Sequence, residues 1–168
     1  MKHQTNQTRE ITRRQAPIRV ALSIDIPEPR EAVFAYLADL TNNSNWNWAV
    51  RATTPLRAGA PHQGAQYIQH RAAPRTGTDL LRISRYSPPG LLEVTGRVDE
   101  GAVRYRYELV TTPAGRTRLT TSVELRSSGE ALTREDLFAA RLGEAVAANL
   151  ESLRAAIAEA RELAPSAA

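Results

Sequence analysis

Apolar and polar residues alternate regularly in three stretches of the chain. Residues 18–26, 103–109 and 119–125 each place an apolar side chain or a threonine at every second position. Successive side chains of a strand point to opposite faces, so this pattern predicts half-buried strands with one apolar face. Shorter runs predict four further strands at residues 49–56, 65–72, 79–86 and 91–98. The short connections between them favour consecutive antiparallel hairpins.

Apolar residues recur at helical spacing in the last long stretch, residues 133–163. The stripe comprises Leu137, Phe138, Leu142, Ala145, Val146, Leu150, Leu153 and Ile157. Good helix formers occupy the positions between them, and no proline follows until Pro165. Thr133 and Asp136 approximate a capping box. A helix of roughly 30 residues is about 45 Å long, and it needs a broad apolar surface to cover its stripe.

Two short helices are predicted after the first strand. Pro27 and Pro29 end that strand and open a helix with an apolar stripe, and residues 41–45 are rich in turn formers. The order is therefore strand, two helices, about six strands, long helix. We expect an α+β fold, in which a curved antiparallel sheet of about seven strands wraps on the C-terminal helix.

Length and composition favour one domain over residues 17–163, between a flexible arm at residues 1–16 and a tail at residues 164–168. The absence of cysteine excludes disulfides, thiolate metal sites and cysteine nucleophiles. His3, His62 and His70 lack ligand spacing, so no metal or other cofactor is expected. No apolar run approaches a membrane span and the N-terminus has no hydrophobic core, so we expect a cytoplasmic protein.

The net charge of +4 and the pI near 9.9 invite a nucleic-acid interpretation. The basic residues are nearly all arginine and are dispersed among glutamates, and only Arg9, Arg13 and Arg14 form a run. Nucleic-acid binding requires a clustered basic patch. We therefore expect no nucleic-acid partner.

Several short motifs occur in a characteristic order. They are residues 24–27 (Ile-Asp-Ile-Pro), Val33-Phe34, residues 37–39 (Leu-Ala-Asp), Asn45-Trp46, Gly64, residues 86–89 (Tyr-Ser-Pro-Pro), residues 115–120 (Gly-Arg-Thr-Arg-Leu-Thr) and residues 149–153 (Asn-Leu-Glu-Ser-Leu). Their order over residues 18–160 resembles the SRPBCC superfamily, also called START-like or helix-grip, and within it the polyketide cyclase/dehydrase-like proteins. The resemblance implies a deep, mostly apolar cavity between the long helix and the concave sheet face. It carries over no invariant catalytic motif, and Trp48 departs from the proline often found there.

Two tyrosines, Tyr105 and Tyr107, share the apolar face of the sixth strand. They are either core residues with backbone partners or a pocket wall that offers hydrogen bonds to a ligand carbonyl. Trp46 either plugs the end of the fold or contacts ligand, and Trp48 suits a stacking lid at the entrance. Asn149 interrupts the helix stripe, so its amide needs either a ligand or a sheet side chain as partner.

Strand alternation leaves the inward side of the third strand open. Either Tyr67, Gln69 and Arg71 face inward, or Ile68 and His70 do, and we favour the first. In the fourth strand, inward Leu81 and Ile83 would bring Arg85 inward as well, with Tyr86 outside. An inward arginine can polarise a carbonyl or hold an enolate; the alternative is an arginine at the rim, paired with a glutamate. His70 with Asp79 is a further possible pair.

Two functions follow. The first is a cyclase or dehydratase without cofactor, with Arg85, Tyr105 and Tyr107 as candidate catalytic residues acting on a polyketide-like substrate. The second is a carrier, sensor or sequestering protein for a lipid-like ligand. In either case the expected ligand-binding residues are Trp46, Trp48, Tyr67, Gln69, Leu142, Val146, Asn149, Leu150 and Leu153. A monomer or homodimer is expected.

Overall fold

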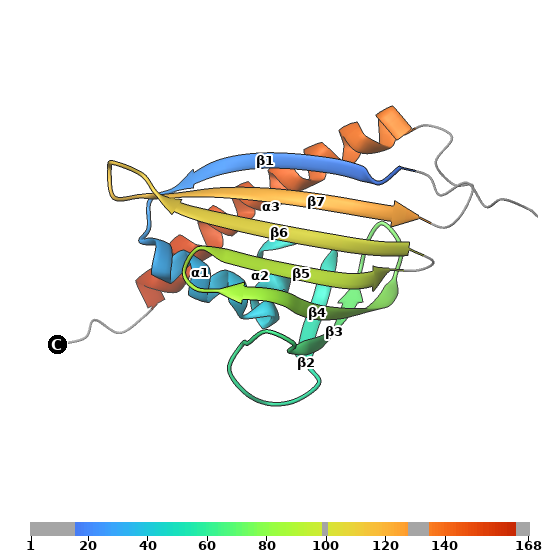
Figure 1. Ribbon diagram of the computed structural model, residues 1–168, viewed down its shortest axis with the longest axis horizontal. Helices are drawn as coiled ribbons and strands as arrows, with labels where there is room; N and C mark the ends of the chain where they lie inside the picture. Colours follow the sequence, from blue (N-terminus) through green and yellow to red (C-terminus); the bar gives the residue numbers. More distant parts are fainter. Residues whose placement is uncertain (1–15, 99–100, 128–134, 164–168) are drawn as a thin grey trace, which may run out of the picture.

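The computed structural model describes residues 16–98, 101–127 and 135–163, which form a seven-stranded antiparallel sheet with a long helix across one face (Figure 1). The order of the strands across the sheet is β1-β7-β6-β5-β4-β3-β2. The strands are β1 (Ile18–Ile26), β2 (Val50–Pro55), β3 (Gln66–Arg71), β4 (Gly77–Ser87), β5 (Leu91–Val98), β6 (Gly101–Thr111) and β7 (Thr117–Ser127). From β2 to β7 each strand pairs with its neighbour in sequence, which confirms the predicted hairpins.

The helices also lie where the sequence pattern predicts them. They are α1 (Arg30–Ala38), the 3₁₀ helix η1 (Leu40–Asn42), α2 (Asn43–Trp46) and α3 (Glu135–Leu163). In Figure 1, α3 runs along the sheet behind β1, β7 and β6, and α1 and α2 lie near its C-terminal half. This arrangement confirms the helix-grip prediction. The expected cap at Thr133, the side chains of Leu137 and Phe138, the residue 1–15 part of the arm and the tail lie outside the described residues.

Pairing of β1 with β7 places the first strand of the chain beside the last one. The two strands run antiparallel in register from Ile18 opposite Leu125 to Ile26 opposite Thr117. On the outer face, Arg118 donates from Nε and Nη2 to the two carboxylate oxygens of Asp25, at 2.8 and 2.9 Å. The hydrogen bonds from this guanidinium lower the pKa of Asp25. Because the pair is exposed, it fixes geometry more than it adds stability.

The core lies between the inner face of the sheet and the helices. On β1 only the two end residues of the inward row, Ile18 and Ile26, are buried, whereas Val20, Leu22 and Ile24 between them are partly exposed. The fully buried residues come from every layer of the fold. The largest of them are Ile26, Val33, Leu37, Leu81, Ile83, Leu92, Leu109, Leu119, Leu153 and Ile157.

Candidate ligand-binding site

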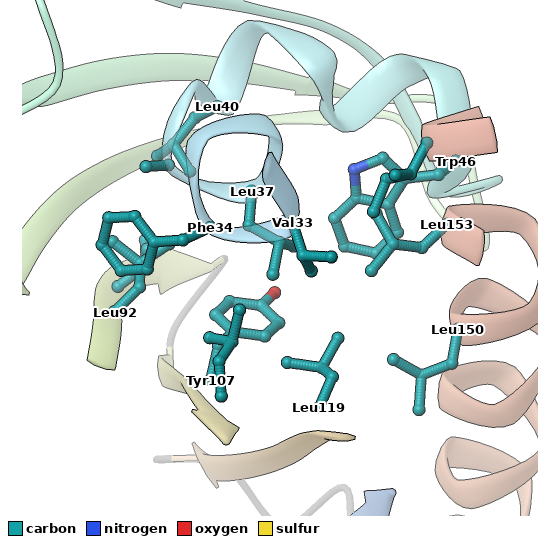
Figure 2. Packing of buried hydrophobic residues seen from close by; sticks show 14 of the residues in the cluster. Val33, Phe34, Leu37, Leu40, Trp46, Leu92, Tyr107, Leu119, Leu150 and Leu153 are labelled. Carbon is teal, nitrogen blue, oxygen red and sulfur yellow. The ribbon is translucent and has the colours of Figure 1, made fainter. Parts of the chain in front are cut away.

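The inner face of the sheet forms an apolar floor that faces α1 and α3. Figure 2 shows Leu119 and Tyr107 on this floor, with Leu150 and Leu153 approaching from α3. Val146, Leu150 and Leu153 are buried in the same cluster, and Leu142 packs against it while partly exposed. Four of the five helix residues predicted for the site therefore face the sheet. The predicted cavity between sheet and helix stays a prediction.

The hydroxyls of Tyr105 and Tyr107 lie within this apolar surrounding. Tyr107 is buried opposite Leu92 and Thr121, and in Figure 2 its hydroxyl points toward α1. Neither hydroxyl makes a hydrogen bond within the described part of the chain. Burial raises the pKa of both phenols, that of Tyr105 to about 12. Both hydroxyls thus stay protonated at neutral pH and can donate.

Two further polar atoms of the core also lack a hydrogen-bond partner within the described residues. The Oγ1 of Thr121, which is beside Tyr107 in the sheet register, is buried without a hydrogen-bond partner among the described residues. The same holds for the indole Nε1 of Trp46, a buried residue of the same core cluster. Native proteins satisfy the large majority of buried polar groups. These four atoms are therefore candidate contacts for a bound molecule.

A buried ion pair on the inner face extends the polar part of the site. Asp79 is fully buried, and its Oδ1 and Oδ2 lie 3.0 and 2.8 Å from the Nε of Arg71. Both groups are close enough to affect the pKa of Tyr105, which Asp79 raises and Arg71 lowers, although burial has the larger effect. The inward placement of Arg71 follows the favoured alternation. His70, which the sequence offers as a further possible partner of Asp79, instead contacts Thr78. The alternation continued back from Leu81 places Asp79 inside.

The predicted inward side of β3 is confirmed. Tyr67 and Gln69 are buried, whereas His70 is exposed. The carbonyl oxygen of Gln69 accepts from Asn43 Nδ2 at 3.2 Å and from Thr53 Oγ1 at 3.5 Å. This side chain therefore ties α2 to the inner face.

The side-chain amide of Asn149 binds the segment between α2 and β2, and not a side chain of the sheet. Its Nδ2 donates to Asn47 Oδ1 at 3.1 Å, and its Oδ1 accepts from the backbone amide of Trp48 at 3.3 Å. Both amide atoms are engaged by the connection between α2 and β2. Trp48 itself is 54% exposed, consistent with a place at an entrance, although its contact with a ligand stays a prediction.

The prediction that Arg85 faces inward is wrong. A β-bulge shifts the register between Ile83 and Arg85, so the alternation slips by one residue. Arg85 is exposed, and Tyr86 instead packs against the core with its ring edge-to-face on Phe34, at 5.4 Å between centroids. Arg85 therefore cannot act on a molecule held against the inner face.

Metal chemistry finds no support in the described ranges, which contain no group of three or more histidine, cysteine, aspartate or glutamate side chains placed to hold an ion. None of the described helices combines the length and the apolar character needed to cross a membrane.

The fold and this inner face define a helix-grip protein of the SRPBCC superfamily. The chain belongs to the family described as polyketide cyclase/dehydrase and lipid transport, which matches residues 17–158. The resemblance inferred from the motifs is thereby confirmed. A comparison with curated proteins finds no match.

Similar solved structures share the fold at low identity. The ZhuI aromatase/cyclase from Streptomyces sp. R1128 is 15% identical, with a TM-score of 0.70 over 90% of this chain and 99% of that chain. Ara h 8.0201 is 13% identical, with a TM-score of 0.66 over 86% and 99%. Protein CV1439 from Chromobacterium violaceum is 19% identical, with a TM-score of 0.61 over 83% and 96%.

Proposed function

We propose that the protein binds a hydrophobic small molecule between the inner sheet face and α3, and that it carries or sequesters this ligand. The observation behind the proposal is a group of polar atoms on the inner face that make no hydrogen bond within the described residues. They are the buried Oγ1 of Thr121 and Nε1 of Trp46, together with the hydroxyls of Tyr105 and Tyr107. An apolar site with a few convergent polar groups is the usual form of a small-molecule pocket. The family description, which includes lipid transport, supports the same class of ligand.

Partly exposed apolar residues on the covered side of the sheet support the same location. Val20, Leu22 and Ile24 of β1 keep accessible surface, as does Leu142 of α3. The close approach of the two elements is marked by Gly143, where a Cβ would lie 3.9 Å from Val20 Cγ1. Since β1 is an edge strand, its accessible row offers an apolar ligand a way in beside the helix.

We rank a carrier above a catalyst because Arg85, the only charged residue among the predicted catalytic residues, does not face the interior. Exposed Arg85 leaves Tyr105 and Tyr107 as the only remaining members of the predicted catalytic set. Phenols with raised pKa values are neutral donors, which stabilise a developing anion less than a cation does. They suit a ligand carbonyl or hydroxyl that is held without being transformed.

The second candidate function is a polyketide cyclase/dehydratase-like reaction on a carbonyl-rich substrate. It is favoured by one observation, the Arg71–Asp79 ion pair on the inner face, whose two charges both act on the pKa of the Tyr105 phenol. A fixed ion pair keeps the charges around this phenol in place while its hydroxyl donates a hydrogen bond to a substrate oxygen. The aromatase/cyclase among the similar structures is consistent with this alternative but shares only the fold.

Co-purified ligand tests the proposal directly. Native mass spectrometry of the purified protein is expected to show a bound apolar molecule, and fatty acids or polyketides added to stripped protein should raise the Tm. Leu142→Trp, which places a larger side chain in the proposed binding space, should abolish both effects. Leu163→Trp, on an exposed residue of the same helix, should leave them intact. Absence of any bound mass together with an unchanged Tm for every apolar compound would overturn the proposal.

A further inference from the structure

A separate hollow opens at the far edge of the sheet, where β2, β3 and β4 meet. It has a volume of about 460 Å³, is partly open to solvent, and is lined by Arg51, Ala52, His70, Arg71, Thr76, Gly77 and Thr78. That volume lies within the usual range of small-molecule sites. None of these seven residues is acidic, and two are arginines.

Arg71 is held in the wall of this hollow from three sides. Its Nε binds both carboxylate oxygens of fully buried Asp79, and its Nη1 donates to the backbone oxygen of Arg75 at 3.4 Å. A Cβ at Gly77 would lie 2.5 Å from Arg71 Nη2, so the guanidinium lies against a glycine backbone that leaves room for it. A guanidinium fixed in this way loses little side-chain entropy when it binds an anion.

Arg51 lines the hollow from a β-bulge in β2. Val50 is opposite Arg71 while Ala52 is opposite His70, so Arg51 is the additional residue of a β-bulge. Bulges redirect side chains and are frequent beside functional sites. Arg51 is exposed, in contrast to buried Val50 on one side and buried Thr53 two residues further on.

Polar groups of β3 and β4 complete the lining. His70 Nδ1 lies 3.3 Å from Thr78 Oγ1, which orients the ring through a contact on one nitrogen. Thr76 adds a second hydroxyl from the turn between these strands. Planar arginine donors together with hydroxyls match the geometry of carboxylate and phosphate oxygens.

We propose that this hollow is an oxyanion-binding site, which takes the carboxylate or phosphate group of a small molecule or lipid. Arg51 supplies the net charge, because Asp79 balances that of Arg71. The guanidinium of Arg71, His70 and the threonine hydroxyls supply directed hydrogen bonds. The site goes beyond the interior ligand site, and it does not require that the interior binds anything.

Calorimetric titration in low-salt buffer tests the site with three probes, namely inorganic phosphate, hexanoate and dihexanoyl phosphatidic acid. Inorganic phosphate has no apolar part, so its binding reports on the hollow and not on the apolar interior. Arg51→Ala is expected to weaken the binding of phosphate by about tenfold, the effect of losing one charge-assisted hydrogen bond. Arg85→Ala, which removes the same charge from an exposed site outside the hollow, should change it by less than about twofold.

The probes also separate the possible sources of the anion. Equal affinity for phosphate and the phospholipid indicates a free anion, and tighter binding of the phospholipid indicates a lipid headgroup. Preference for hexanoate indicates a carboxylate. Each of these outcomes supports the site if Arg51→Ala weakens the binding of the preferred probe. The proposal would be overturned if no probe binds at a concentration of about 10 mM, because a Kd above that value means a binding free energy of only a few kcal/mol. Equal weakening by Arg51→Ala and Arg85→Ala would do the same, because it would mean diffuse attraction to a basic protein.

Discussion

Asn149 of α3 and Asn47, which follows α2, are joined by a hydrogen bond of 3.1 Å between Nδ2 and Oδ1. The same Asn47 oxygen accepts from the amide of Ala49, and Asn149 Oδ1 accepts from the amide of Trp48. The middle of the long helix is thereby attached to the corner that presents exposed Trp48. This contact determines where the tryptophan stands relative to the helix that covers the inner face.

Asn149→Ala should lower the free energy of unfolding by about 1–3 kcal/mol, because it leaves the Asn47 oxygen and the Trp48 amide without this partner. Urea unfolding monitored by tryptophan fluorescence measures the change. Ser44→Ala, on an exposed residue of the neighbouring α2, is the control and should shift the midpoint little. Equal effects of both changes would show that the asparagine contact adds nothing.

Leu150 is 3% exposed and lies on the face of α3 that covers the sheet. Leu150→Ala should cost about 2–5 kcal/mol of unfolding free energy. If the side chain borders a ligand cavity, the loss should fall at the lower end, since that space is already unfilled in the wild type. Leu163→Ala, 77% exposed near the end of the same helix, is the matched control. An unchanged urea midpoint for Leu150→Ala would contradict the assigned face.

The fold could be predicted because its signals are local and repeated. Strands such as β1 and β7 alternate over their whole length, and α3 keeps one apolar stripe over many turns. One half-apolar sheet and one long helix have few ways to bury each other. The order of elements therefore determined the architecture before any contact was known.

The site could be predicted only in part, because a β-bulge has no clear signal in the alternation. The bulge after Ile83 exchanges the sides of Arg85 and Tyr86, and with them a proposed catalytic residue and a core residue. The pairing of Arg71 with Asp79 was missed for a different reason. Alternation places both inward, but the sequence alone does not set the register between β3 and β4.

The buried Arg71–Asp79 pair allows a prediction about stability. Asp79→Ala should destabilise the fold by about 3–5 kcal/mol, because it removes a carboxylate from a buried guanidinium. The double change Arg71→Met with Asp79→Leu should recover most of the loss, because it replaces two charges with apolar volume. Urea unfolding of the single and double variants checks this, and a double variant as unstable as Asp79→Ala would contradict it. The double variant should also lose phosphate binding in the hollow.

Alkaline pH should weaken the fold through the buried phenols. The pKa of Tyr105 rises from 10.0 to about 12 on folding, so above pH 10 the unfolded chain releases a proton that the folded protein keeps. The stabilisation is therefore complete below pH 10 and is lost progressively between pH 10 and 12. Lys2 is the only lysine, so the other side chains that titrate in this window are chiefly the four remaining tyrosines, of which Tyr67 and Tyr107 also have raised pKa values. Tyr105→Phe should reduce the fall in unfolding free energy between pH 9 and pH 11; an identical fall would contradict a buried phenol.

Phenylalanine substitutions decide between a carrier and a catalyst. In a carrier, Tyr105→Phe and Tyr107→Phe should each weaken ligand binding by about 0.5–1.5 kcal/mol, the loss of one neutral hydrogen bond. Trp48→Ala should weaken it further if the exposed tryptophan is an aromatic anchor. In a catalyst, the tyrosine changes should instead lower turnover by about 10²-fold with little change in affinity, because a donor aimed at a developing oxyanion acts mainly in the transition state.

The measurement pairs a binding titration with product analysis, on a ligand found by co-purification or by screening polyketides and fatty acids. Arg85→Met is the control for both, since an exposed side chain beyond the bulge should alter neither affinity nor turnover. A large loss of turnover in Arg85→Met would contradict the placement of the bulge and restore this arginine as a candidate. Loss of affinity in all three aromatic variants, with no product formed by the wild type, would establish the carrier. Product formation that depends on Tyr105 would place the chemistry on the side of the inner face that holds the Arg71–Asp79 pair, since both of these charges act on the pKa of this phenol.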